Sequence, residues 1–124
     1  MSYFKSVEDI EIWNLGINLC VDLYEEIEKS TPFKQDFALK DQVKRSSISI
    51  PSNVAEGFER YSNNEFIRFL YISKGSCGEL RTQLLISKRL GYIDVKEYDE
   101  FNKRCVTISK KLSKLILFLK KKTF

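Results

Sequence analysis

Apolar side chains recur at steps of three and four residues along four segments of the chain, which is the period of amphipathic helices. The first segment runs from Val7 to Lys29 and ends where Ser30-Thr31-Pro32 breaks the pattern. Its exposed side is rich in Asp and Glu, so we expect an acidic surface there. The positions that we expect to face the core are Ile10, Trp13, Ile17, Cys20, Val21, Tyr24 and Ile27.

The second segment covers Ala38 to Glu59 and has an unusual centre of small and polar residues around Pro51. A proline inside a helix removes one backbone donor and crowds the carbonyl group four residues earlier. The apolar period nevertheless continues across Pro51 without a shift, so we predict one kinked helix and not two abutting helices. The expected core positions are Leu39, Val43, Ser47, Ile50, Val54 and Phe58.

The third segment opens with Ser62 and Glu65, spaced as in a capping box, and continues to Leu90 before Gly91 stops it. One side carries the expected core residues Phe66, Phe69, Ser73, Cys77, Leu80, Leu84 and Ser87. The opposite side, which we call the second face, carries Tyr71, Gly75, Gly78, Thr82, Leu85 and Ile86. A helix with small and apolar residues on both sides is covered on both sides. The second cover must come from another subunit or from an unusually close neighbouring helix, so we expect a homo-oligomer.

The fourth segment begins at a cap-like Asp94 and runs to about Lys121. Its apolar positions form a coiled-coil-like seam of Tyr98, Phe101, Cys105, Ile108, Leu112, Leu115 and Leu119. The apolar run from Leu115 to Leu119 exceeds one stripe, so part of this end also needs a partner. Four long helices with short connections predict an all-α fold, an antiparallel up-down four-helix bundle that occupies residues 1–124 as a single domain.

Composition narrows the function classes. The chain has 124 residues, 43% of them hydrophobic, and no histidine, which excludes Ser-His-Asp and Cys-His catalysis, His-ligated haem and His-containing di-iron sites. Catalysis through Glu or Lys stays formally open, but no carboxylate pair is placed convincingly. Cys20, Cys77 and Cys105 are far apart and form no Cys-x-x-Cys pair, so we expect small hydrophobic side chains, no metal and no cofactor.

The same composition bears on location. No uncharged apolar stretch is long enough to span a membrane. The N-terminal residues 1–5 lack the basic-then-apolar order of a secretion signal. We therefore expect a cytoplasmic protein without catalytic residues.

Basic residues fall in two stripes, within a total of 21 Lys and Arg against 17 Asp and Glu. Lys74, Arg81 and Lys88 repeat every seven residues, so they share one flank of the third helix about 10 Å apart. On the fourth helix, the side opposite the core carries Lys103, Lys110, Lys114 and Lys121. These stripes either track the phosphates of a nucleic acid or simply solvate a protein that recruits another polypeptide.

Two further patterns have alternative interpretations. Gly75-Ser76-Cys77-Gly78 is similar to the G-x-x-G loop of some RNA-binding modules, but it lies inside a helix, so close helix packing explains it better. Glu56 follows Asn53 and Ala55 in the small segment around Pro51, and Glu79 follows Gly78 directly, so small neighbours allow close backbone approach there. With Arg45, the residues Asn53, Glu56 and Glu79 are the candidate structural polar residues. Either Glu56 or Glu79 lies in an interface with Arg45 or Arg81, or both are ordinary surface acids.

The chain resembles the bacterial four-helix-bundle family of the large-subunit ribosomal RNA intervening-sequence proteins. Trp13 near the start and Leu90-Gly91-Tyr92-Ile93 agree with this family. The most specific part of the resemblance is the run from Ser49 to Gly57. This run lies within the first of three stretches that resemble the family, which are Gln42-Val43-Lys44-Arg45-Ser46-Ser47-Ile48-Ser49-Ile50-Pro51-Ser52-Asn53-Val54-Ala55-Glu56-Gly57, Glu65-Phe66-Ile67-Arg68-Phe69-Leu70 and Gly75-Ser76-Cys77-Gly78-Glu79-Leu80.

This resemblance implies an up-down four-helix bundle that assembles as a homopentamer around a central channel. The accessory variability proteins of diversity-generating retroelements are similar, and in those a basic pentamer engages nucleic acid and a reverse transcriptase. The leading hypothesis is therefore a non-enzymatic homo-oligomer that contacts nucleic acid, structured RNA above all, through Lys74, Arg81, Lys88, Lys103, Lys110 and Lys114. The alternative is an adaptor that recruits another polypeptide and binds no nucleic acid.

Overall fold

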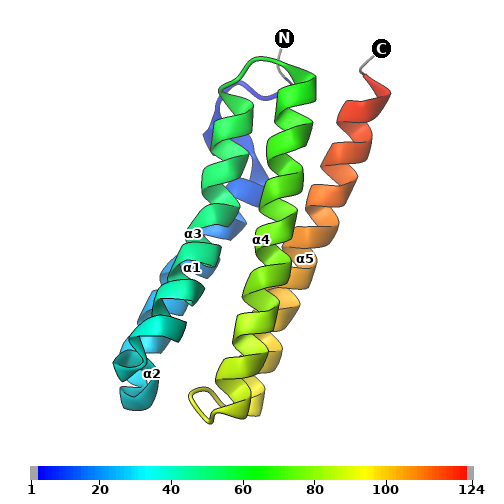
Figure 1. Ribbon diagram of the computed structural model, residues 1–124. Helices are drawn as coiled ribbons and strands as arrows, with labels where there is room; N and C mark the ends of the chain where they lie inside the picture. Colours follow the sequence, from blue (N-terminus) through cyan, green and yellow to red (C-terminus); the bar gives the residue numbers. More distant parts are fainter. Residues whose placement is uncertain (1–2, 123–124) are drawn as a thin grey trace.

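Four long helices alternate in direction along the bundle, as the sequence predicts. The computed structural model describes residues 3–122, in which the elements are η1 (Val7–Asp9), α1 (Glu11–Lys29), α2 (Thr31–Gln35), α3 (Phe37–Phe58), α4 (Asn63–Arg89) and α5 (Val95–Lys121). Residues 1–2, part of the N-terminal stretch considered above, lie outside the described residues. Figure 1 shows α4 running beside α3 and α5, with α1 behind α3. The packing of α1 on α5 is the least extensive between neighbouring long helices.

The buried side of α1 differs from the predicted one. Val21 is exposed, and Trp13, Ile17, Cys20 and Tyr24 are only half-buried. Apolar residues at helical spacing occupy two adjacent stripes of this helix, so periodicity alone does not choose between them. The core stripe is Ile12, Gly16, Leu19, Leu23 and Ile27, and Ile10 is buried just before the helix.

Gly16 determines which side of α1 meets α3. A Cβ atom added to Gly16 would lie 3.2 Å from both Cβ and Cδ of Pro51, so the two backbones approach closely at this point. Any larger side chain would separate the helices, because Pro51 is itself buried and its ring cannot rotate away.

Helix α3 is continuous from Phe37 to Phe58, with Pro51 inside it, so the prediction of one helix is confirmed. Figure 1 shows α3 changing direction about midway along its length, as expected of a helix that contains a proline. Val43, Ser47, Ile50 and Val54 are buried as predicted, whereas Leu39 and Phe58 are half-buried at the two ends.

Serine hydroxyl groups occupy the contact between α3 and α4. The buried Ser73 hydroxyl donates to the carbonyl oxygen of Ile50 at 2.8 Å, and the Ser49 and Ser76 hydroxyls lie 2.8 Å apart. The Asn53 amide donates to both the hydroxyl and the carbonyl oxygen of Ser49, each at 2.8 Å. Small side chains allow the two helices to approach, and these bonds satisfy their polar atoms. The small polar centre of α3, around Pro51, therefore forms a surface that packs against α4.

Local capping residues set the ends of α4 and α5. Ser62 caps α4, but Glu65 pairs with Arg68 at 3.1 Å and does not complete the predicted capping box. Asp94 and Glu97 form a complete capping box at the start of α5, with hydrogen bonds of 2.8 and 2.7 Å. On α4, Leu70 is buried where Phe69 was expected, and on α5 Ile116 joins the predicted seam while Tyr98 and Leu115 remain half-buried.

Candidate nucleic-acid interface

The basic stripe of α4 lies over the groove between α4 and α5. The Lys74 ammonium donates to the Ser109 hydroxyl at 2.9 Å, and the Arg81 Nε atom donates to Asn102 Oδ1 at 2.9 Å. The Lys88 ammonium lies 5.0 Å from the centre of the Tyr98 ring. Each of the three cations therefore contacts a side chain of α5, and together they join the two helices along most of their length.

A different set of lysines covers the side of α5 that points away from the core. We call this set, Lys103, Lys110, Lys114 and Lys121, the outer face of α5. All four are exposed, and within residues 3–122 none of them forms a salt bridge. The outer face therefore presents positive charge that no nearby carboxylate neutralises by direct contact.

The cations on the flank of α5 that faces α1 are used differently. Arg104 donates to Asp22 at 2.8 Å, and Lys111 donates to Glu11 at 2.9 Å. Both carboxylates belong to the acidic side of α1, so part of that acidity holds α5 against α1. Leu15 and Ile108 lie in a shallow depression of about 140 Å³ on the same seam.

The second face of α4 is uncovered in the single chain. Tyr71 and Ile86 are 48% and 44% exposed, Thr82 is exposed, and Leu85 is half-buried. A Cβ atom added to Gly75 or Gly78 would have no heavy atom within 4 Å. The expectation that these glycines lie at a close helix contact is therefore wrong within one chain. Cover by another subunit stays a prediction.

The four polar residues lie mostly at the surface. Arg45 pairs with Asp41 at 2.8 Å, and Glu56 pairs with Arg60 at 3.0 Å, each within one exposed helical turn. Glu79 is exposed, and Asn53 is half-buried where it bonds to Ser49. Within residues 3–122, neither Glu56 nor Glu79 forms a salt bridge with Arg45 or Arg81.

A carboxylate pair that the sequence does not reveal joins α1 to the start of α5. Burial and a hydrogen bond with Glu97 raise the pKa of Glu26 from 4.5 to about 7, and the negative charges of Glu97 and Asp94 add to this shift while Lys29 opposes it. Glu97 was recognisable only as part of a cap-like pattern, because its partner lies on a distant segment. The pair makes Glu26 a proton-holding group near neutral pH.

Cys77 and Cys105 are poor nucleophiles. Burial raises the pKa of the Cys77 thiol to about 11 and that of Cys105 to about 12, so both stay protonated at neutral pH. Within residues 3–122, no cluster of three or more Asp, Glu or Cys side chains is arranged to hold a metal ion. In the same range, no helix is apolar over a length sufficient to cross a bilayer.

Comparison with known proteins decides the family. The family model described as 23S rRNA-intervening sequence protein matches residues 8–114. The chain belongs to this family. The matched residues span α1, α2, α3, α4 and most of α5, including the serine-rich contact between α3 and α4.

A solved structure shows the same fold. It is a crystal structure of a protein of unknown function from the S23 ribosomal protein family of Bacteroides thetaiotaomicron, with a TM-score of 0.76 and 24% sequence identity. The match covers 85% of this chain and 97% of the other. No curated protein sequence is significantly similar to this chain. The comparisons thus establish the family and the fold of this chain.

Proposed function

We propose that the protein is a non-enzymatic, homo-oligomeric binding protein that contacts nucleic acid, structured RNA above all, through the outer face of α5. The observation that carries the proposal is the exposure of Lys103, Lys110 and Lys114 on one side of α5, without a carboxylate partner within residues 3–122. Lysines without an internal partner can neutralise phosphates at no cost in lost ion pairs.

Lys74, Arg81 and Lys88 have a second role in this proposal. Since each already contacts a side chain of α5, binding a phosphate would compete with a contact inside the bundle. We therefore assign the main phosphate contacts to α5 and a supporting contribution to the α4 stripe. Of the six phosphate-binding residues expected from the sequence, the three on α5 therefore make the main contacts.

Self-association is the second part of the proposal. The second face of α4 exposes Tyr71 and Ile86 beside two glycines with open space above them. A second copy of the chain would bury these apolar groups and approach closely at the glycines. The family resemblance implies five subunits. Such an assembly would repeat the outer face of α5 several times and strengthen binding through multivalency.

The alternative is an adaptor that recruits another polypeptide. Its support is the exposure of Leu117 and Phe118 near the end of α5, which adds to the uncovered second face of α4. Apolar docking changes little with salt, whereas phosphate contacts weaken steeply as salt rises. Salt dependence therefore separates the two functions.

The experiment measures the dissociation constant for a fluorescent RNA hairpin by anisotropy at several salt concentrations. Replacement of Lys103, Lys110 and Lys114 by Gln should weaken binding and lower the slope of log affinity against log salt by about 2 to 3. A control variant carries Gln at Lys5, Lys34 and Lys96, which are exposed elsewhere. Equal losses in the two variants would contradict a specific role for the outer face of α5, and binding of no RNA by the wild type would favour the adaptor.

A further inference from the structure

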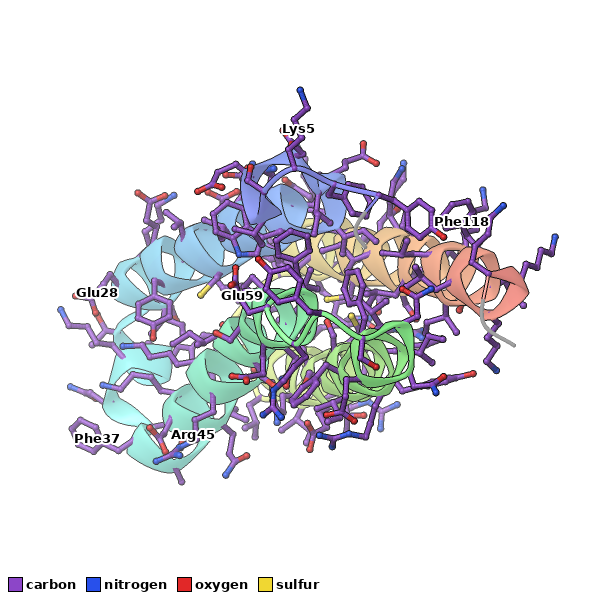
Figure 2. The ribbon with its side chains drawn as sticks, turned by 90° about the horizontal axis from the view of Figure 1, so that it is seen from above. Lys5, Glu28, Phe37, Arg45, Glu59 and Phe118 are labelled. Carbon is purple, nitrogen blue, oxygen red and sulfur yellow. The ribbon has the colours of Figure 1, made fainter. Side chains whose placement is uncertain are left out.

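Three partly exposed aromatic rings gather at the end of the bundle where α3 turns into α4. The rings of Tyr3 and Phe118 meet edge to face, with centroids 4.9 Å apart. Tyr3 also lines, together with Tyr61, the depression above Gly57 and Phe66. Figure 2 looks onto this end and shows Phe118 on the side of α5 and Glu59 at the end of α3. We call Tyr3, Tyr61 and Phe118 the aromatic end.

Tyr61 is held in an unusual backbone conformation. Its φ angle is +55°, and among the non-glycine residues from 3 to 122 no other φ is positive. The left-handed region is disfavoured for a tyrosine, for which Gly or Asn would be the ordinary choice. The side chain is also 78% exposed, more than any other large hydrophobic side chain of the described residues. The backbone conformation is unfavourable for a tyrosine and most of the side chain stays in solvent, which points to a role in binding.

Positive charge surrounds these rings. The Lys122 ammonium lies 5.5 Å from the centre of the Phe118 ring, and Lys120 donates to the Tyr71 hydroxyl at 2.8 Å. Lys121, the last residue of the outer face of α5, lies in the same turn. Of the carboxylates at this end, Glu56 and Glu65 are both paired with Arg60, and Glu59 is exposed. The row of lysines on the outer face of α5 thus ends beside the aromatic end.

Exposed rings next to lysines match the chemistry of a nucleic-acid strand whose bases are unpaired. A single strand offers the flat faces of its bases for stacking, whereas a duplex stacks them inside the helix and presents phosphates, sugar hydroxyl groups and base edges. We infer that the aromatic end binds unpaired nucleotides by stacking a base on Tyr61 while α5 holds the adjoining phosphates. This inference rests on the proposed function and names the class of nucleic acid: single-stranded segments, such as the loops of a folded RNA.

The test compares a fluorescent 15-nucleotide uridine RNA with a blunt RNA duplex of the same length, using the full chain. The wild type should bind the single strand more tightly. Tyr61→Asn, which tolerates the left-handed conformation, should weaken single-strand binding by about 5- to 150-fold and leave the salt slope unchanged. Tyr61→Trp should retain the affinity, and duplex binding should not change with either variant.

The matched control is Phe37→Asn. Phe37 is 72% exposed and has a lysine, Lys40, over its ring at 4.4 Å, but it lies at the opposite end of α3, about 30 Å from Phe58. This variant should bind the single strand as the wild type does. Thermal unfolding followed by circular dichroism confirms that each variant folds.

The outcomes separate this inference from the proposed function. Loss of binding in the Lys103, Lys110 and Lys114 variant without any effect of Tyr61→Asn would overturn the stacking site and leave the lysine face in place. An equal loss with Phe37→Asn would also overturn it. Binding to phosphatidylserine vesicles that depends on Tyr61, with no dependence of RNA binding, would assign this end to a membrane surface. Failure of the wild type to bind any RNA would overturn both proposals.

Discussion

Gly57 lies so close to Phe69 that a Cβ atom added to the glycine would be 2.8 Å from the Cβ atom of the phenylalanine. The same added atom would lie 3.2 Å from the backbone Cα atom of Phe66, which cannot move independently of α4. Gly57 therefore allows the end of α3 to pack directly against the start of α4. Glycine near the end of a helix is commonly a helix-ending residue, but the structural role of Gly57 is close packing.

Gly57→Ala should lower the free energy of unfolding by about 1 to 3 kcal/mol, because the added methyl group forces the two helices apart. Urea unfolding followed by circular dichroism, at one protein concentration, measures this change. Ser52→Ala, at an exposed position of the same helix, serves as the control and should change the stability little. A Gly57→Ala protein as stable as the wild type would show that the contact relaxes without cost.

Gly78→Leu should leave the single chain folded and disrupt its assembly. Gly78 is exposed and nothing lies within 4 Å of a Cβ atom added there, so a side chain has open space at this position of the single chain. Against a second copy it would prevent close approach. Light scattering should show a smaller mass with unchanged helical content, whereas Lys96→Leu, at an exposed position of α5, should keep the wild-type mass. An unchanged mass for Gly78→Leu would exclude this part of α4 from the interface.

The double variant Lys74→Gln, Arg81→Gln should lose more free energy of unfolding than free energy of RNA binding. Both side chains donate to α5, so their loss should lower the free energy of unfolding by about 1 kcal/mol in total. Their effect on RNA affinity should be smaller than that of replacing Lys103, Lys110 and Lys114. The reverse order of the two effects would make the α4 stripe the main phosphate site.

Glu26 should make stability depend on pH between about 4.5 and 7. The pKa of Glu26 is 4.5 in its ordinary state and about 7 in the folded chain, so in this window the folded state binds more protons than the unfolded state. The free energy of unfolding therefore falls as pH rises through the window. Glu26→Gln should flatten this dependence in urea unfolding, and Glu25→Gln, at an exposed neighbouring carboxylate, should not. An unchanged pH dependence in Glu26→Gln would contradict the assignment.

The helices were predictable from the sequence because their signals are local. Ser62 and Asp94 cap the helices that follow them, and the seam from Phe101 to Leu112 has a single apolar stripe, whereas the apolar run after Leu115 has more than one. The buried side of α1 was not predictable, since two stripes have the same spacing and the choice depends on the meeting of Gly16 with Pro51.

The candidate site was predictable only where its pattern is local to one helix. Helical periodicity places Lys74, Arg81 and Lys88 on one flank of α4, but it does not reveal that α5 covers that flank. The outer face of α5 was predictable because it lies opposite an unambiguous core stripe. The pairing of Glu26 with Glu97 and the meeting of Tyr3 with Phe118 join distant segments, which only the fold brings together.

The most direct test of the central claim is size-exclusion chromatography with light scattering, at low and high salt, with and without a folded RNA that carries an unpaired loop. We expect an oligomer, of five subunits as the family resemblance implies, that elutes with the RNA at low salt and separates from it at high salt. An oligomer that ignores RNA at both salt concentrations would contradict nucleic-acid binding. A monomer would contradict the assembly through α4.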